Sequence, residues 1–67
     1  MNRLEEYLRQ RYSKTHWPYY GHIQAKQEIG ESFDSDAKEL RDKEMIKPTP
    51  GLNGWLIEMT NLEKWNI

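Results

Sequence analysis

The spacing of apolar residues changes once along this chain, close to residue 45, and this change constrains the fold more than any other feature. Up to residue 44 the apolar residues recur every three or four positions, which is the period of an amphipathic helix. Further on, Trp55, Ile57 and Met59 alternate with other residues, as in a strand with one buried face. The sequence therefore predicts an α+β fold, mostly α, in which three helices precede a two-stranded β-hairpin.

One small apolar core must stabilise this fold. The chain has 67 residues, which is enough for one domain, and no cysteine, so no disulfide and no thiolate metal site can form. The longest uninterrupted apolar run, Trp55-Leu56-Ile57, is far below the ~20 residues of a membrane span. No apolar signal-peptide core stands at the N-terminus. We therefore expect residues 1–67 to form a single cytoplasmic domain.

The first helix is predicted over residues 2–15. Its apolar stripe includes one charged residue and consists of Leu4, Tyr7, Leu8, Arg11 and Tyr12. Asn2 can cap the helix, and Glu5 follows three residues later, as in a capping box. We expect the stem of Arg11 to pack on the core while its guanidinium pairs with an acid. The alternative is that this guanidinium binds a phosphate.

A connector over residues 15–21 separates this helix from the second one. Pro18 disfavours helix at the residue before it, and Gly21 allows a turn. The aromatic residues of the connector are Trp17, Tyr19 and Tyr20. They are expected to cover one end of the core; if exposed, they could form a platform on which nucleic-acid bases stack.

Two shorter helices come next. The second helix is predicted over residues 22–30, ending at Gly30, where a left-handed residue is favoured. The third is predicted over residues 33–44, with Ser32 or Asp34 as its cap. Its apolar positions, spaced four and then three residues apart, are Phe33, Ala37 and Leu40. Its opposite face presents Ser35, Lys38, Glu39 and Asp42.

Residues 45–59 are predicted to form the hairpin. Its first strand, Met45-Ile46-Lys47, should end at Pro48, because proline cannot donate to a strand ladder. Residues 49–54 have turn composition, in which Pro-Gly suits a type II turn and Asn-Gly a type I′ turn. In the second strand Trp55 is expected to be buried and to seal the contact between helices and hairpin.

The C-terminal residues 60–67 are predicted to form a final turn. Thr60-Asn61-Leu62-Glu63 matches the T-x-x-E capping box, which begins helical turns. The turn would place Leu62 and Trp65 on one side.

Two segments carry a resemblance to known families. Leu40-Arg41-Asp42-Lys43-Glu44-Met45-Ile46 resembles the L-x-x-K-G-x-I ending of the recognition helix in winged-helix transcriptional regulators. Residues 54–65, GWLIEMTNLEKW, are similar to the G-x-W-x-I and L-E-x-W segments of small excisionase-like winged helices. The resemblance implies a winged helix-turn-helix domain, whose third helix enters the DNA major groove while the hairpin, or wing, touches the backbone or minor groove. Glu44 replaces the glycine that usually ends the recognition helix.

Candidate DNA contacts follow from this resemblance. On the third helix they are Ser35, Lys38, Arg41 and Lys43, and on the wing they are Lys47 and Asn53. The net charge of −1 and the acidic residues of the third helix argue against a nucleic-acid surface, because phosphates repel carboxylates.

Two functions therefore remain open. One is double-stranded DNA binding, as a transcriptional regulator or as an excisionase-like accessory factor of recombination. The other is a winged-helix module that binds a protein and no DNA, through the acidic third helix or the patch of Trp17, Tyr19 and Tyr20. The charge of the face formed by the third helix and the wing discriminates between them: a positive stripe favours DNA, and a negative one favours a protein partner.

Enzymatic chemistry is not expected. His16 and His22 have no cysteine and no carboxylate at a helical ligand spacing, so a metal site is not predicted. The glycines at 51 and 54 lack the G-K-S/T ending of a phosphate-binding loop. We therefore expect neither a catalytic site nor a cofactor.

Overall fold

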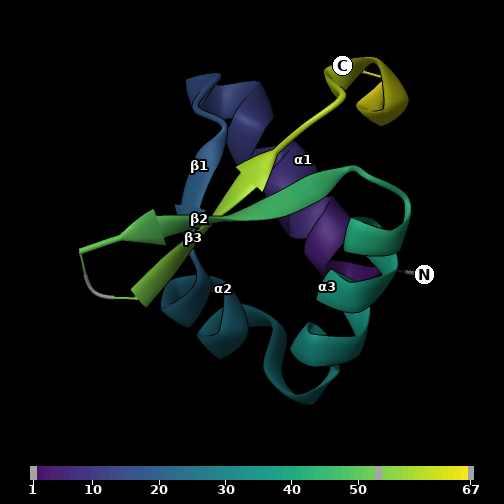
Figure 1. Ribbon diagram of the computed structural model, residues 1–67. Helices are drawn as coiled ribbons and strands as arrows, with labels where there is room; N and C mark the ends of the chain where they lie inside the picture. Colours follow the sequence, from purple (N-terminus) through teal and green to yellow (C-terminus); the bar gives the residue numbers. More distant parts are fainter. Residues whose placement is uncertain (1, 53, 67) are drawn as a thin grey trace.

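The computed structural model describes residues 2–52 and 54–66 and shows an α+β fold that is mostly helical. In chain order the elements are α1 (Arg3–Thr15), β1 (Tyr19–Gly21), α2 (His22–Ile29), the 3-10 turn η1 (Gly30–Ser32), α3 (Phe33–Asp42), β2 (Ile46–Gly51), β3 (Gly54–Met59) and the 3-10 turn η2 (Leu62–Trp65). Figure 1 shows the β2–β3 hairpin crossing the molecule, with α2 and α3 on different sides of it. The predicted helices and hairpin are present, with ends that differ by one to three residues.

The sheet has a third strand that the sequence did not predict. The strand order is β1-β3-β2, with both pairs antiparallel, and Tyr20 of β1 lies opposite Ile57 of β3. The connector expected over residues 15–21 is therefore partly a strand. Pro18 favours extended backbone at its neighbour, and its carbonyl accepts a hydrogen bond from the Met59 amide at 2.9 Å. β1 thus pairs with the edge of β3 that a two-stranded hairpin would leave exposed.

β2 continues through two prolines, so the expectation that the strand ends at Pro48 was wrong. β2 lies at the edge of the sheet, where Pro48 is opposite Ile57 and Pro50 is opposite Trp55. On β3 the Met59 amide points towards β1, and the amide of the following residue, Thr60, donates to the Met45 carbonyl beside β2. By this alternation both prolines occupy positions whose N–H would point away from β3, so neither interrupts the ladder.

The beginning of α1 is fixed by α3 as well as by its own cap. The Asn2 side chain accepts from the Glu5 amide at 2.9 Å, which confirms the predicted cap. Asp36 Oδ2 on α3 accepts from the amides of Arg3 and Leu4 at 3.1 and 3.4 Å. A carboxylate at a helix N-terminus satisfies free amides and complements the helix dipole. This long-range cap orients α3 relative to α1.

α3 ends at Asp42, two residues earlier than predicted, in a Schellman motif. Glu44 has φ of 61° and is therefore left-handed. Its amide donates to the Arg41 carbonyl, and the Met45 amide donates to the Leu40 carbonyl, each at 2.9 Å. Position 44 thus adopts the conformation for which glycine is favoured, as the resemblance to glycine-ended recognition helices implies. Neither Ser32 nor Asp34 caps α3; η1 runs directly into it.

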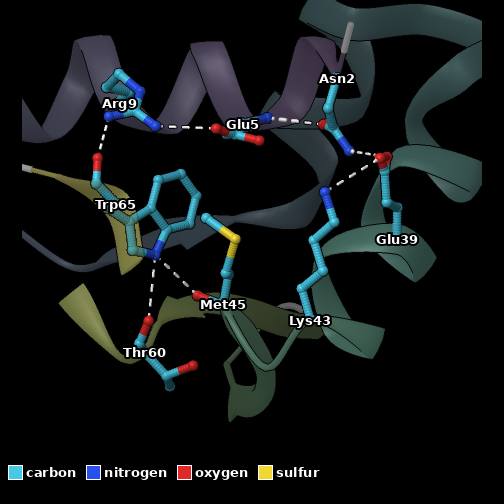
Figure 2. Close-up of polar contacts among 8 residues, drawn as sticks. All are labelled: Asn2, Glu5, Arg9, Glu39, Lys43, Met45, Thr60 and Trp65. Carbon is cyan, nitrogen blue, oxygen red and sulfur yellow. Dashed lines mark hydrogen bonds and ion pairs between the residues drawn. The ribbon is translucent and has the colours of Figure 1, made fainter. Parts of the chain in front are cut away.

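The C-terminal turn closes the core with Trp65, which is completely buried. Its indole Nε1–H is shared between the carbonyls of Met45 and Thr60, at 3.1 and 3.2 Å, and Arg9 donates to its carbonyl oxygen (Figure 2). The predicted capping box was wrong, because the Thr60 hydroxyl donates to the Glu44 carbonyl and the η2 turn has no side-chain cap. The inward placement of Trp65, with Leu62 packed beside it, is confirmed.

Three further side chains differ from the prediction. Arg11 is exposed and its guanidinium lies 4.9 Å from the centre of the Tyr7 ring, without the expected acidic partner among the described residues. Trp17 is 60% exposed, so it does not cover the core. Trp55 is half-buried, and the completely buried tryptophan of this part of the chain is Trp65. Side-chain burial here depends on contacts distant in sequence, which local periodicity does not reveal.

Candidate nucleic-acid interface

The candidate surface lies on the side of α3 that faces away from the core. Phe33, Ala37 and Leu40 are buried, and at 100° per residue Ser35, Lys38 and Asp42 fall on the opposite side. All three of these polar residues are exposed. The predicted outward face of the third helix is therefore confirmed as a solvent-exposed surface.

The structure divides the predicted contacts between two shallow depressions. Ser35, Lys38 and Lys43 border one of about 360 Å³, which also contains Glu39 and Asp42. Arg41 and Lys47 border another of about 410 Å³, formed where the end of α3 meets the start of β2. Asn53 lies outside the described residues. The other wing candidate, Lys47, is at the base of the hairpin and not at its tip.

Each candidate lysine is close to a carboxylate. Lys38 Nζ is 3.5 Å from Asp42, Lys43 Nζ is 3.7 Å from Glu39, and Lys47 Nζ is 3.8 Å from Glu58. Glu39 also accepts from the Asn2 side chain, so it lies between α1 and Lys43 (Figure 2). These pairs neutralise the face locally, and neither a positive stripe nor a negative one results.

Arg41 differs from the lysines. It is exposed, and within the described residues no carboxylate forms an ion pair with it. A guanidinium is always charged at neutral pH and can hold two oxygens of a phosphate or the edge of a guanine. Among the predicted contacts on α3, Arg41 therefore has the chemistry best suited to a nucleic acid.

The hairpin tip and α3 lie at different ends of the molecule. Figure 1 shows the tip projecting away from α3, with α2 between them. The longest dimension of the molecule is 28 Å, less than the ~34 Å of one turn of B-DNA. Both elements could therefore contact one duplex within a single helical turn.

The histidines have structural surroundings. His16 follows α1 as its left-handed C-cap and lies edge-on to Tyr12, with 5.4 Å between ring centres. His22 stacks on Trp55 with ring centres 4.7 Å apart, and its Nδ1 is 2.8 Å from the Trp55 carbonyl oxygen. Over residues 2–52 and 54–66, no group of three His, Cys, Asp or Glu side chains is arranged to hold a metal ion.

The contact of His22 with the hairpin was missed by sequence reasoning. The residues are 33 positions apart, and histidine at the start of a helix has no local signal for a partner. Gly54 offers a partial clue, since a Cβ atom there would lie 2.6 Å from the His22 ring. Only the structure shows that the glycine is needed for this close approach.

Comparison with known proteins adds no relative: no family model, no curated protein and no solved structure matches the chain. Within the described residues no helix combines the length and the apolar character needed to cross a membrane.

Proposed function

We propose that this protein is a small cytoplasmic DNA-binding protein with a winged helix-turn-helix arrangement. α2 and α3 are joined only by the three-residue turn η1, and the β2–β3 hairpin follows α3 directly. The left-handed Glu44 supports the same reading, because it occupies the position where the recognition helix of winged-helix regulators has glycine. The third strand extends the sheet behind the hairpin and leaves α3 exposed.

In this proposal α3 enters the major groove and Arg41 is its principal contact. The carrying observation is that this exposed arginine has no acidic partner among the described residues and borders, with Lys47, the depression between α3 and the wing. Ser35 and Lys38 extend the contact along the helix, and Lys43 meets the flanking phosphates.

The ion pairs on this face determine how binding would behave. Exposed pairs such as Lys38–Asp42 are weakly coupled, so a phosphate can replace the carboxylate as the partner of the lysine. The displaced carboxylates remain close to the DNA and repel it. We therefore expect modest affinity with a shallow dependence on salt, reflecting few net phosphate contacts.

The experiment is a fluorescence anisotropy titration of duplex DNA over a range of salt concentrations. The double variant Arg41→Ala, Lys47→Ala should weaken binding about tenfold or more and flatten the salt slope by about two contacts. The control is Lys14→Ala, Lys26→Ala, which removes the same charge from exposed positions of α1 and α2. Equal loss in both double variants would contradict a specific α3 surface, and absence of binding at low salt would contradict DNA binding altogether.

A second candidate function is binding to a protein, and the mixed charge of α3 favours it. Glu39 and Asp42 lie beside Lys38 and Lys43, as on a surface that matches a partner of alternating charge. If duplex DNA does not bind, this face is the one to test, with Glu39→Lys, Asp42→Lys as the disrupting variant. Whether a DNA-binding role serves transcription or recombination would be decided by the sites that the protein occupies.

A further inference from the structure

An uncharged groove lies between the start of α2 and the hairpin tip, away from the candidate DNA surface. It has a volume of about 590 Å³. Nine residues line it, none of them Asp, Glu, Lys or Arg: Gly21, His22, Ile23, Gln24, Gly51, Leu52, Gly54, Trp55 and Leu56. In a chain with 31% charged residues, an uncharged surface of this size is unusual.

Glycines create the hollow. Gly21, Gly51 and Gly54 are three of the four glycines of the chain, and all three line the groove. A Cβ added at Gly21 would meet nothing within 4 Å, so the space beside it is open. The side chains of Ile23, Trp55 and Leu56 stand around this space and make its walls apolar.

The groove is held in shape by the contact between His22 and the hairpin. The stacked rings of His22 and Trp55 join the first residue of α2 to the second residue of β3. The hydrogen bond to the Trp55 carbonyl and the close approach of Gly54 fix the same junction. The two walls of the groove therefore belong to one connected unit.

An apolar side chain that could fill such a groove stands at its rim. Leu52, at the hairpin tip, has an exposed fraction of 103%, so it does not fold back into its own groove. Ile23 on the opposite rim is 49% exposed. Together they leave an apolar knob and an apolar hollow side by side on one face.

We propose that this face pairs with the same face of a second copy of the chain, with Leu52 of each copy inserted in the groove of the other. A two-fold interface brings a patch against itself, so every charge in the patch would meet a like charge across the axis. This patch has no charge to repel its copy, and it presents both the knob and the hollow that such pairing requires. The proposal does not depend on DNA binding.

Pairing through strand edges is a less suitable route to the same dimer. β2 presents Pro48 and Pro50 at its free edge, where neither can donate a hydrogen bond to another chain. β1 has three residues. The knob and groove therefore offer a better self-complementary contact than either edge.

The first experiment measures the mass of the protein in solution by sedimentation equilibrium, at concentrations up to about 1 mM, the limit of weak specific association. The parent chain should form a dimer. Leu52→Lys should raise the dissociation constant about tenfold or more, because a central apolar anchor is replaced by a charge. Leu52→Met is the matched control and should dimerise like the parent, since it keeps an apolar knob of similar volume.

The second experiment fills the hollow. Gly21→Leu should weaken dimerisation as much as Leu52→Lys does, while the fold remains intact, because the added side chain meets open space and φ at Gly21 is −66°. Circular dichroism and thermal melting check the fold. A mixture of the Leu52→Lys and Gly21→Leu variants should then associate better than either alone, since the leucine of one fits the open groove of the other.

Three results would overturn the proposal. The parent chain could be monomeric at every concentration, or it could form a dimer that Leu52→Lys does not weaken. In the third, the mixture of variants associates no better than each variant alone, which would assign knob and groove to a different partner. If a monomeric parent lost DNA binding on Leu52→Lys, the hairpin tip would belong to the DNA surface instead.

Discussion

The two tryptophans at either end of the β3 region show how differently this small domain uses the same residue. Trp65 is completely buried, with its indole N–H and its carbonyl both hydrogen-bonded. Trp55 is half-buried, stacks on His22 and lines an open groove. The first closes the core, whereas the second supports a surface. Stability and recognition thus lie at opposite ends of one hairpin.

The largest expected effect tests this difference directly. Trp65→Ala should lower the free energy of unfolding by ~3–5 kcal/mol, the usual loss for a buried tryptophan, and should nearly unfold a domain of this size. Trp55→Ala should cost about half as much, because part of its surface is already in water. Urea melts of both variants and the parent chain measure the two losses. A greater loss for Trp55→Ala would reverse the comparison and restore the expectation from the alternating pattern.

The next effect concerns the junction of α1 and α3. Asp36→Ala should lower stability by ~1–2 kcal/mol, because the amides of Arg3 and Leu4 lose their acceptor. Asp34→Ala is the matched control, since Asp34 is an acid in the same first turn of α3 but is exposed. The difference between the two melting curves isolates the contribution of the cap between helices. Equal losses would show that only the helix dipole is involved.

A smaller effect, of opposite sign, is expected at the end of α3. Glu44→Gly should raise stability by about 1 kcal/mol, because glycine adopts the left-handed conformation of φ 61° without the strain caused by a Cβ atom. Glu44→Ala removes the same carboxylate but keeps Cβ, so it should show no such gain. A lower melting temperature for Glu44→Gly than for Glu44→Ala would place residue 44 in a right-handed helix.

These variants also mark what the sequence could and could not predict. The three helices and the hairpin follow from the change in period near residue 45, and the unusual conformation of Glu44 follows from the family resemblance. The cap by Asp36 could not be found, since it joins residues more than 30 positions apart. β1 has only three residues, too few to show a period, and becomes a strand through its pairing with β3.

The candidate site was predicted as a list of residues but not as an arrangement. Helical spacing correctly placed Ser35, Lys38 and Arg41 on the exposed surface of α3. It did not reveal that Lys47 pairs with Glu58 across the hairpin, because that contact depends on the register between β2 and β3. For the same reason Arg41, and not a lysine, became the principal proposed contact only once the ion pairs were known.

The smallest effect distinguishes the two ends of the hairpin without unfolding the molecule. His22→Ala removes the ring stacked on Trp55 and the hydrogen bond to its carbonyl, so it should cost only on the order of 0.5–1 kcal/mol at this half-buried position. The loss should be local, because α1, α3 and Trp65 do not contact His22 through these interactions. Amide hydrogen exchange should therefore quicken at β3 residues near the tip, while the indole N–H of Trp65 keeps its protection. His22→Phe, which keeps a stacking ring, should restore most of the protection at the tip. Faster exchange at Trp65 in His22→Ala would mean that the two ends open together and that the division between core and surface is wrong.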